Sequence, residues 1–253
     1  MRPSRALSWL CVFTLGAVVC STPAAAQSVN RAAINELNEQ LMYVALPLTL
    51  FVELMLVYAI YRFHNNDDPR PTVDDPALEV TWTAATGAIL VFVGISGFFV
   101  LANPYISPAS ADSTVEAGEG IEIDVLTYQW GYEFSYGDTG VTTSETLYLR
   151  NDTDVRFTLR STDVIHSFYI PELGLKQDIF PSQETVARTH PTENGTHRLY
   201  CAELCGSGHA RMQAPVVVLN QSEYDDWLGE QQEAGTNSMS TPDANATAGA
   251  NTN

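Results

Sequence analysis

Two long apolar runs limit what the first part of the chain can form. One run covers residues 41–63 and contains Glu53, and the other covers residues 80–101. About twenty apolar residues suffice for a helix to cross a bilayer. We therefore expect a transmembrane hairpin over residues 27–103, with spans at about 41–63 and 80–101. A carboxylate is costly in hydrocarbon, so we expect Glu53 to be a neutral acid bonded to a neighbouring helix, and its role stays unassigned.

The segment before the first span has the plan of a secretory signal peptide. Residues 1–26 contain two arginines, then an apolar run, then small residues at the expected cleavage site. Removal of this segment would also remove Cys11 and Cys20, and the mature chain would keep only Cys201 and Cys205. After export of its start, a two-span hairpin in the cell membrane would return the rest of the chain to the extracytoplasmic side. The basic residues between the spans agree with a cytoplasmic loop.

Beyond the second run, apolar residues alternate with polar ones, and Gly, Asp and Asn residues separate the short stretches. Several short strands at such intervals are typical of an all-β sandwich or barrel, which we expect over residues 104–231. Ser222 and Asp225 indicate a capping box that opens a short helix ending near Gln231. The polar residues 232–253 have no apolar period and are expected to be disordered. The alternating stretches are Ile121/Ile123/Val125, Leu147/Leu149, Val155/Phe157/Leu159 and Val216/Val218.

A cluster of soft metal ligands lies between two of the strand-like stretches. The sequence Cys-Ala-Glu-Leu-Cys-Gly-Ser-Gly-His-Ala-Arg-Met places Cys201, Cys205, His209 and Met212 in one loop. Thiolate, imidazole and thioether ligands favour copper over magnesium or calcium. If both sulfurs bridge, two coppers can share them, and each copper then needs one imidazole. His166, between other strand-like stretches, is the candidate for the second imidazole.

Two other interpretations of the cysteines remain at this point. An exported pair of cysteines can form a disulfide, and sets of Cys and His often hold structural zinc. Met212 favours copper, because zinc has little use for a thioether and a disulfide needs no histidine.

The loop resembles the dinuclear copper (CuA) signature of cytochrome c oxidase subunit II. The resemblance includes Ser-Thr-Asp-Val-Ile-His-Ser-Phe at residues 161–168 and Ile-Pro-Glu-Leu-Gly-Leu-Lys-Gln-Asp at residues 170–178, and it covers about residues 40–230. It implies a cupredoxin-like Greek-key barrel or sandwich behind the two helices. It also implies the ligand roles: Cys201 and Cys205 bridge the coppers, His166 and His209 bind one each, and Met212 and the Glu203 carbonyl bind weakly.

The same resemblance implies two roles for carboxylates. The side chain of Glu203 matches a magnesium ligand at the contact with subunit I, and Asp178 matches a residue at that contact. Glu79, in Glu-Val-Thr-Trp-Thr, matches a residue at the mouth of a proton-uptake path. The family commonly has proline where this chain has Thr86.

Aromatic residues occupy every second position from Trp130 to Tyr136. The alternation alone predicts that Tyr132, Phe134 and Tyr136 fill one face of a strand in the core. Trp130 matches the first tryptophan of an aromatic run in the family, where it lies at the surface above the copper and receives electrons. The family's second tryptophan is Tyr132 in this chain.

The charge is strongly negative, at −18 with 30 acidic and 12 basic residues, and Lys176 is the only lysine. Such a balance disfavours nucleic acid as a partner. It suits either a docking face for a basic protein or solvation at high salt, and the lysine-poor usage resembles that of extreme halophiles, including haloarchaea.

The resemblance therefore implies the subunit through which electrons enter a proton-pumping haem–copper oxidase. The chain has no plausible haem pocket, so haem and oxygen reduction belong to subunit I, packed with other oxidase subunits against the two spans. The donor is a cytochrome c or a small blue-copper protein. The alternatives are the copper subunit of a nitric oxide reductase and a membrane-tethered module that binds or delivers copper. Quinol-oxidase subunits lack the copper ligands, and nitrous oxide reductase is a much longer soluble chain.

Overall fold

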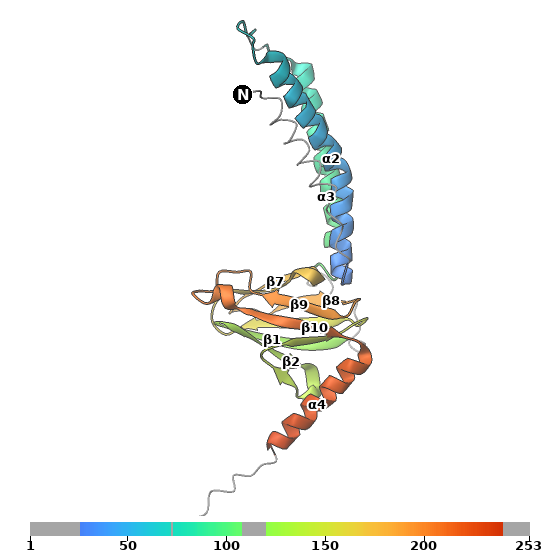
Figure 1. Ribbon diagram of the computed structural model, residues 1–253, viewed down its shortest axis with the longest axis vertical. Helices are drawn as coiled ribbons and strands as arrows, with labels where there is room; N and C mark the ends of the chain where they lie inside the picture. Colours follow the sequence, from blue (N-terminus) through green and yellow to red (C-terminus); the bar gives the residue numbers. More distant parts are fainter. Residues whose placement is uncertain (1–25, 72, 108–119, 240–253) are drawn as a thin grey trace, which may run out of the picture.

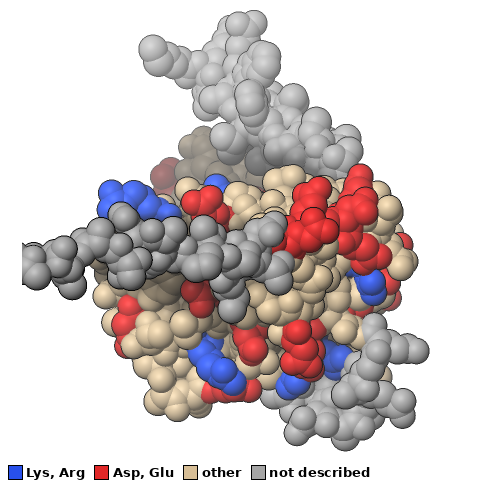
Figure 2. Space-filling model, turned by 90° about the horizontal axis from the view of Figure 1, so that it is seen from below, with Lys and Arg blue, Asp and Glu red and all other residues tan. Residues whose placement is uncertain are grey.

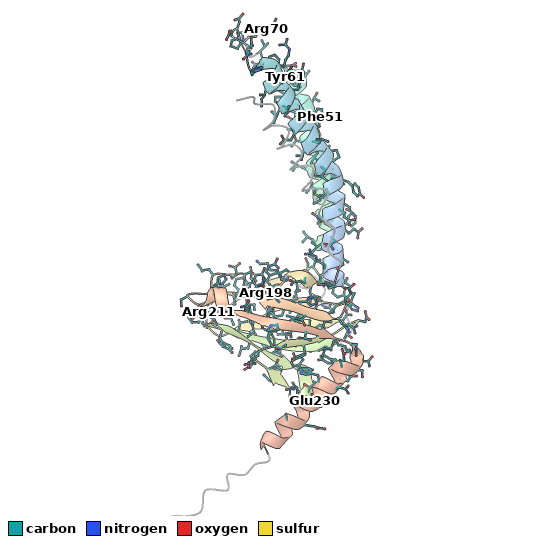
Figure 3. All side chains as sticks on the ribbon, in the orientation of Figure 1. Phe51, Tyr61, Arg70, Arg198, Arg211 and Glu230 are labelled. Atoms are coloured by element: carbon teal, nitrogen blue, oxygen red, sulfur yellow. The ribbon has the colours of Figure 1, made fainter. Side chains whose placement is uncertain are left out.

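Two antiparallel helices lead into a β domain in the computed structural model, which describes residues 26–71, 73–107 and 120–239 (Figure 1). Helix α2 spans Val29–Phe63 and helix α3 spans Pro76–Leu101. Both are long and apolar enough to cross a membrane. Phe51 and Tyr61 illustrate their apolar outer surface, which suits lipid or another apolar partner (Figure 3). The expected signal peptide, with Cys11 and Cys20, lies outside the described residues except at its end.

Helix α2 begins at Val29, well before the expected start of the first span near residue 41. Ser28 caps this end, because its hydroxyl accepts a hydrogen bond from the backbone N–H of Arg31. The additional turns are polar and lie between the apolar run and the β domain. The membrane span predicted from hydropathy is therefore only the distal part of a longer helix.

The β domain is a sandwich of two five-stranded sheets. Strand β1 pairs in parallel with β5, and β10 pairs in parallel with β4, while the other pairs are antiparallel. The expected all-β, cupredoxin-like Greek-key architecture is confirmed. One sheet contains, in order, β3 (Thr142–Thr143), β2 (Gly131–Tyr136), β1 (Ile121–Tyr128), β5 (Val155–Ser161) and β8 (Thr185–Thr189). The other contains β4 (Leu147–Arg150), β10 (Gln213–Leu219), β9 (Gly195–Tyr200), β6 (His166–Ile170) and β7 (Leu175–Ile179).

The core fills the space between the sheets, and the alternation along the strands decides which residues enter it. Every apolar residue in the predicted alternating stretches is buried except Ile121, which is partly buried. On β2, Tyr132, Phe134 and Tyr136 all point inward, as expected. The Tyr132 hydroxyl donates to the carbonyl of Ser167, 2.9 Å away, so its buried polar atom is satisfied.

A buried polar junction attaches the helical hairpin to the β domain. The Ser28 hydroxyl donates to the Leu173 carbonyl in the short helix η3 (Pro171–Leu173), at 2.6 Å. Asn30 is fully buried, and its side-chain N–H group donates to the carbonyls of Tyr105 and Arg188, both at 2.8 Å. Tyr105 follows the end of α3, so this one amide joins the start of one helix, the end of the other and the end of β8.

Helix α4 spans Gln221–Met239 and packs its first turns against the sandwich. Its cap is Asn220 instead of the expected Ser222: the Asn220 side chain accepts from the Glu223 N–H, and the Glu223 carboxylate accepts from the Asn220 N–H. This is the reciprocal capping box, two residues earlier than predicted. Trp227 stacks on Tyr148 with ring centroids 4.3 Å apart and fixes the helix on the domain.

The expected helix end near Gln231 is wrong, because the helix continues to Met239. Residues 232–239 of the expected disordered tail are therefore helical, and the rest of that tail, residues 240–253, lies outside the described residues. The residues after Gln231 begin with Gln, Glu and Ala, which favour helix even without an apolar period. The side chain of Gln232 also donates to the carbonyl of Thr139 in the short helix η2 (Gly137–Thr139), at 3.2 Å.

We expect Asn220→Ala to lower the free energy of unfolding by about 1 kcal/mol, because the first turn of α4 loses its cap. Ser222→Ala is the matched control and should change it by less than about 0.5 kcal/mol. Urea unfolding of the full chain in detergent, followed by tryptophan fluorescence, measures both. Equal losses in the two variants would contradict the assignment of the cap.

Candidate metal centre

The loop between β9 and β10 carries five of the six expected ligands: four side chains and the Glu203 carbonyl. The backbone N–H of Cys201 donates to the carbonyl of Met212, at 3.1 Å, and closes the loop at its base. The short helix η4 (His209–Arg211) forms its far side. Figure 3 shows Arg211 at the end of the β domain opposite the attachment of the hairpin, so the loop lies away from the junction.

The sulfur atoms converge inside this loop. The Sγ atoms of Cys201 and Cys205 are 3.7 Å apart, and both cysteines are free. This distance is far longer than a disulfide bond, so the disulfide interpretation does not hold in this structure. The Sδ atom of Met212 lies 3.8 Å from the Cys205 Sγ. All three residues are at most 4% exposed, so their sulfurs are shielded from water.

Nitrogen and oxygen donors complete the cluster. The Nδ1 atom of His209 lies 3.6 Å from the Cys205 Sγ, and the Glu203 carbonyl oxygen lies 3.2 Å from the Cys201 Sγ. His166, at the start of β6, comes from the distant part of the sequence, and one of its ring nitrogens lies within 4.8 Å of both cysteine sulfurs. The structure thus brings all six sequence-predicted metal ligands together.

His166 supplies a test of whether the cluster fits a metal. Its ring is fully buried, and its Nε2 atom lies 2.8 Å from the Asp163 carboxylate. Its Nδ1 atom is buried and has no hydrogen-bond partner among the described residues. Buried polar atoms are nearly always satisfied, so an unpaired nitrogen beside two thiols is what a metal ligand looks like before the metal is added. The residues therefore fit the copper that the donor set favours.

Asp163 holds the His166 ring in the required tautomer. Burial alone would raise the pKa of this carboxyl group, but hydrogen bonds from His166 and from the backbone N–H groups of Val164 and Gln129 outweigh it and keep the pKa below its usual value. The charged carboxylate accepts a hydrogen bond from the Nε2–H group, which leaves the lone pair on Nδ1 free. The sequence shows an Asp three residues before the His, but its supporting role was not predicted.

Trp130 covers the loop from the surface. Its indole N–H donates to the Cys205 carbonyl at 3.1 Å, and the residue is 39% exposed. A Cβ atom on Gly208 would lie 2.2 Å from the Trp130 ring, so glycine is needed for this close approach. The side chain of Gln129 donates to the same carbonyl at 2.8 Å, a contact that sequence reasoning did not identify.

The remaining predicted site residues lie outside the cluster of sulfurs and imidazoles. The side chains of Glu203 and Asp178 lie beside Lys176, whose ammonium is 3.8 Å from the first carboxylate and 3.3 Å from the second. Glu79 lies in the first turn of α3 and is exposed. This turn lies at the end of the hairpin that is far from the loop between β9 and β10 (Figure 1). Glu53 is exposed on α2. The structure does not bring Glu79 or Glu53 to the metal ligands.

Carboxylates outnumber basic groups on the face of the molecule that is seen from the end opposite the hairpin (Figure 2). Figure 2 views the molecule from the end opposite the hairpin and shows clusters of acidic side chains with fewer basic ones between them. This distribution is consistent with both explanations of the acidic composition, a docking face for a basic donor and solvation at high salt, which stay predictions.

The buried Cys205 thiol should react slowly before metal binds. Burial raises the pKa of Cys205 to about 11, and the neighbouring Cys201 adds to the shift. The folded environment favours the neutral thiol, so at pH 8 the thiolate fraction should be roughly a hundredfold below that of an ordinary cysteine. We expect alkylation of Cys205 in the metal-free protein to be slower by about that factor and to accelerate up to about pH 11. Mass spectrometry of the Cys205 peptide, with urea-unfolded protein as control, measures it, and equal folded and unfolded rates would contradict the prediction.

Comparisons with known proteins divide the chain at the same place as the structure. The family model of the cytochrome c oxidase subunit II transmembrane domain matches residues 20–100, and that of the periplasmic domain matches residues 132–220. The chain is therefore a two-span membrane protein with its β domain on the extracytoplasmic side.

Individual proteins agree with the family models. Cytochrome c oxidase subunit 2 of Synechocystis is 29% identical over 85% of this chain and 77% of its own length. The subunit of Alkalihalophilus pseudofirmus is 33% identical over 72% of this chain and 53% of its own. The crystal structure of the periplasmic domain of subunit II from Bradyrhizobium japonicum covers 47% of this chain and 99% of its own, with 20% identity and a TM-score of 0.45. With both family models matched in their natural order, the chain belongs to the cytochrome c oxidase subunit II family.

Proposed function

We propose that Cys201, Cys205, His166, His209, Met212 and the Glu203 carbonyl hold a dinuclear copper centre through which electrons enter a cytochrome c oxidase. The observation that carries this proposal is the convergence of two free thiols, two imidazoles and a thioether in one cluster, in which all but His209 are buried and the His166 Nδ1 is unpaired. Two sulfur atoms 3.7 Å apart can both bind two metals, whereas a mononuclear copper site has only one cysteine and cannot.

The protein keeps the ligands in place during electron transfer. When bound, the copper pair supplies reversible one-electron storage. The strands on both sides fix the two ends of the loop, the Asp163 carboxylate fixes the His166 ring, and the buried sulfurs exclude water. Because the ends of the loop and the His166 ring are fixed, the ligands should move little between oxidation states. Little driving force is then lost to rearrangement.

Trp130 is the proposed point of electron input. One side of the indole is exposed to a donor, and its N–H contacts the carbonyl of a copper ligand. The proposed donor is a cytochrome c or a small blue-copper protein, attracted where the acidic surface meets a basic face. Haem in subunit I is the proposed acceptor, with subunit I and other oxidase subunits packed on α2 and α3.

Further assignments extend the proposal to two carboxylates. Glu203 can offer its side chain to magnesium at the contact with subunit I, where Lys176 forms an ion pair with both Glu203 and Asp178. Glu79 is exposed at the start of α3, as the mouth of a proton-uptake path requires. The proposed division of the chain is a signal peptide at 1–26, the hairpin, the copper domain and α4.

A module that delivers copper fits the geometry less well. A delivery site must release its metal, whereas these sulfurs are almost fully buried and held by two strands. The matched proteins are named as oxidase subunits, which gives the oxidase preference over a nitric oxide reductase.

Copper analysis with electron paramagnetic resonance tests the metal assignment on the purified full chain. We expect two coppers per chain and one unpaired electron split by both nuclei, because the two thiolates share the pair. Cys205→Ser should lose this shared signal, and Ser222→Ala should keep it. One copper with a four-line signal, or zinc without a signal, would contradict the dinuclear proposal.

Substitutions at Trp130 test electron input. Trp130→Phe should slow reduction of the copper centre by a reduced cytochrome c at least about tenfold, equivalent to ~1.4 kcal/mol of activation free energy, with copper content unchanged. Gly208→Ala should act in the same direction, because its methyl group displaces the indole. Trp227→Phe, on α4, is the control. Stopped-flow absorbance gives the rates, and an unchanged rate in Trp130→Phe would remove Trp130 from the route.

A further inference from the structure

Gln129 contacts more of the candidate metal centre than its exposed position suggests. Its side-chain amide donates to the Cys205 carbonyl at 2.8 Å, and its backbone N–H donates to the Asp163 carboxylate at 2.7 Å. It therefore joins the loop after β1 to both segments that carry the copper ligands.

These two bonds link parts that are distant in the sequence. The Asp163 oxygen that does not accept from Gln129 lies 2.8 Å from the His166 Nε2, so the backbone of Gln129 steadies the carboxylate that orients this imidazole. The Cys205 carbonyl accepts from both Gln129 and Trp130, and a carbonyl oxygen has two lone pairs for two such donors. Gln129 is thus bonded to the backbone of a cysteine ligand and to the carboxylate that orients a histidine ligand, and it shares its acceptor with the indole.

The ligand loop is shaped to receive the Gln129 amide. Gly206 follows Cys205 directly and has a φ angle of +112°, a conformation that side chains other than glycine rarely adopt. A Cβ atom there would lie 2.9 Å from the Gln129 Nε2. The peptide between Cys205 and Gly206 is turned toward Gln129, and glycine leaves the room for it.

We propose that Gln129 is a positioning residue for the copper centre. It fixes the Cys205 carbonyl, and with it the Trp130 indole, and so tunes the redox potential of the metal pair. The inference rests on the proposed function of the loop and adds a residue that touches no metal ligand atom. Hydrogen bonds around a ligating cysteine tune the redox potential of copper sites, and supporting residues typically contribute 10–100-fold to affinity or activity. A donor on the Cys205 carbonyl withdraws electron density from the peptide next to the thiolate, which favours the reduced metal.

Gln129→Met tests the proposal, because methionine keeps the length of the side chain and removes the donor. The residue is exposed, so the fold does not depend on it. In the purified copper-loaded full chain we expect unchanged copper content, a lower midpoint potential, and reduction by cytochrome c that is slower by about tenfold. Gln221→Met, at the exposed start of α4, is the matched control and should leave the potential and the rate unchanged.

A second readout uses the metal-free protein. Trp130 fluorescence, isolated by difference from Trp130→Phe, should be quenched more strongly by acrylamide in Gln129→Met, because the shared carbonyl is less firmly held. Gln129→Glu should show at least as much quenching, because its carboxylate cannot donate to the carbonyl. A role that depends only on side-chain volume would leave quenching normal in both.

The results separate the two levels of proposal. A wild-type chain with one copper or with zinc overturns the proposed function, while the quenching experiment still decides whether Gln129 holds the indole. A wild-type chain with two coppers supports that function, and normal potential, rate and quenching in Gln129→Met would then overturn the role of Gln129 alone.

Discussion

The antiparallel pairing of β9 with β10 is the constraint on which the metal centre depends. Tyr200 pairs with Gln213, so the residues that follow and precede them, Cys201 and Met212, begin and end the ligand loop. The hydrogen bond between these two residues closes it. Because strand pairing is held by the whole sandwich, the distance between the first and last ligands does not depend on the metal. The loop can thus place both thiols and the thioether together in the metal-free chain.

The polar junction at the other end of the domain sets a second constraint. Asn30 is a single buried amide that bonds to the end of α3 and to the end of β8, while Ser28 bonds to η3. Asp154 accepts from both Tyr105 and His190 at the same place. These contacts fix the direction in which the two helices leave the domain. The position of the loop relative to the two helices follows from this junction, since the loop lies at the opposite end of the β domain (Figure 1).

The sequence predicted features that depend on local pattern and missed those that depend on contacts between distant segments. Alternation of apolar and polar residues predicted the strands, and the two apolar runs predicted the membrane spans. The cluster of soft ligands predicted the metal-binding loop. The sequence predicts a cap at Ser222 instead of Asn220, because two overlapping patterns of a polar residue followed three positions later by an acid compete. The structure shows the reciprocal hydrogen bonds for Asn220 and Glu223. The start of α2 was missed because its polar turns are stabilised by the β domain. Nothing local reveals that Gln129 meets Cys205, which is 76 residues away in sequence.

The proposed centre must satisfy two opposing requirements, and the arrangement of Trp130 suits both of them. Ligands that change little on electron transfer need a dry and rigid surrounding, which the almost fully buried sulfurs have. A donor protein, however, can approach only the surface. Trp130 is 39% exposed, and its indole N–H donates a hydrogen bond to the backbone carbonyl of the ligand residue Cys205. Access and burial are therefore assigned to different residues, joined by one carbonyl. Because Gln129 holds the same carbonyl from the neighbouring position, two hydrogen bonds fix the short link between the surface and the proposed metal pair.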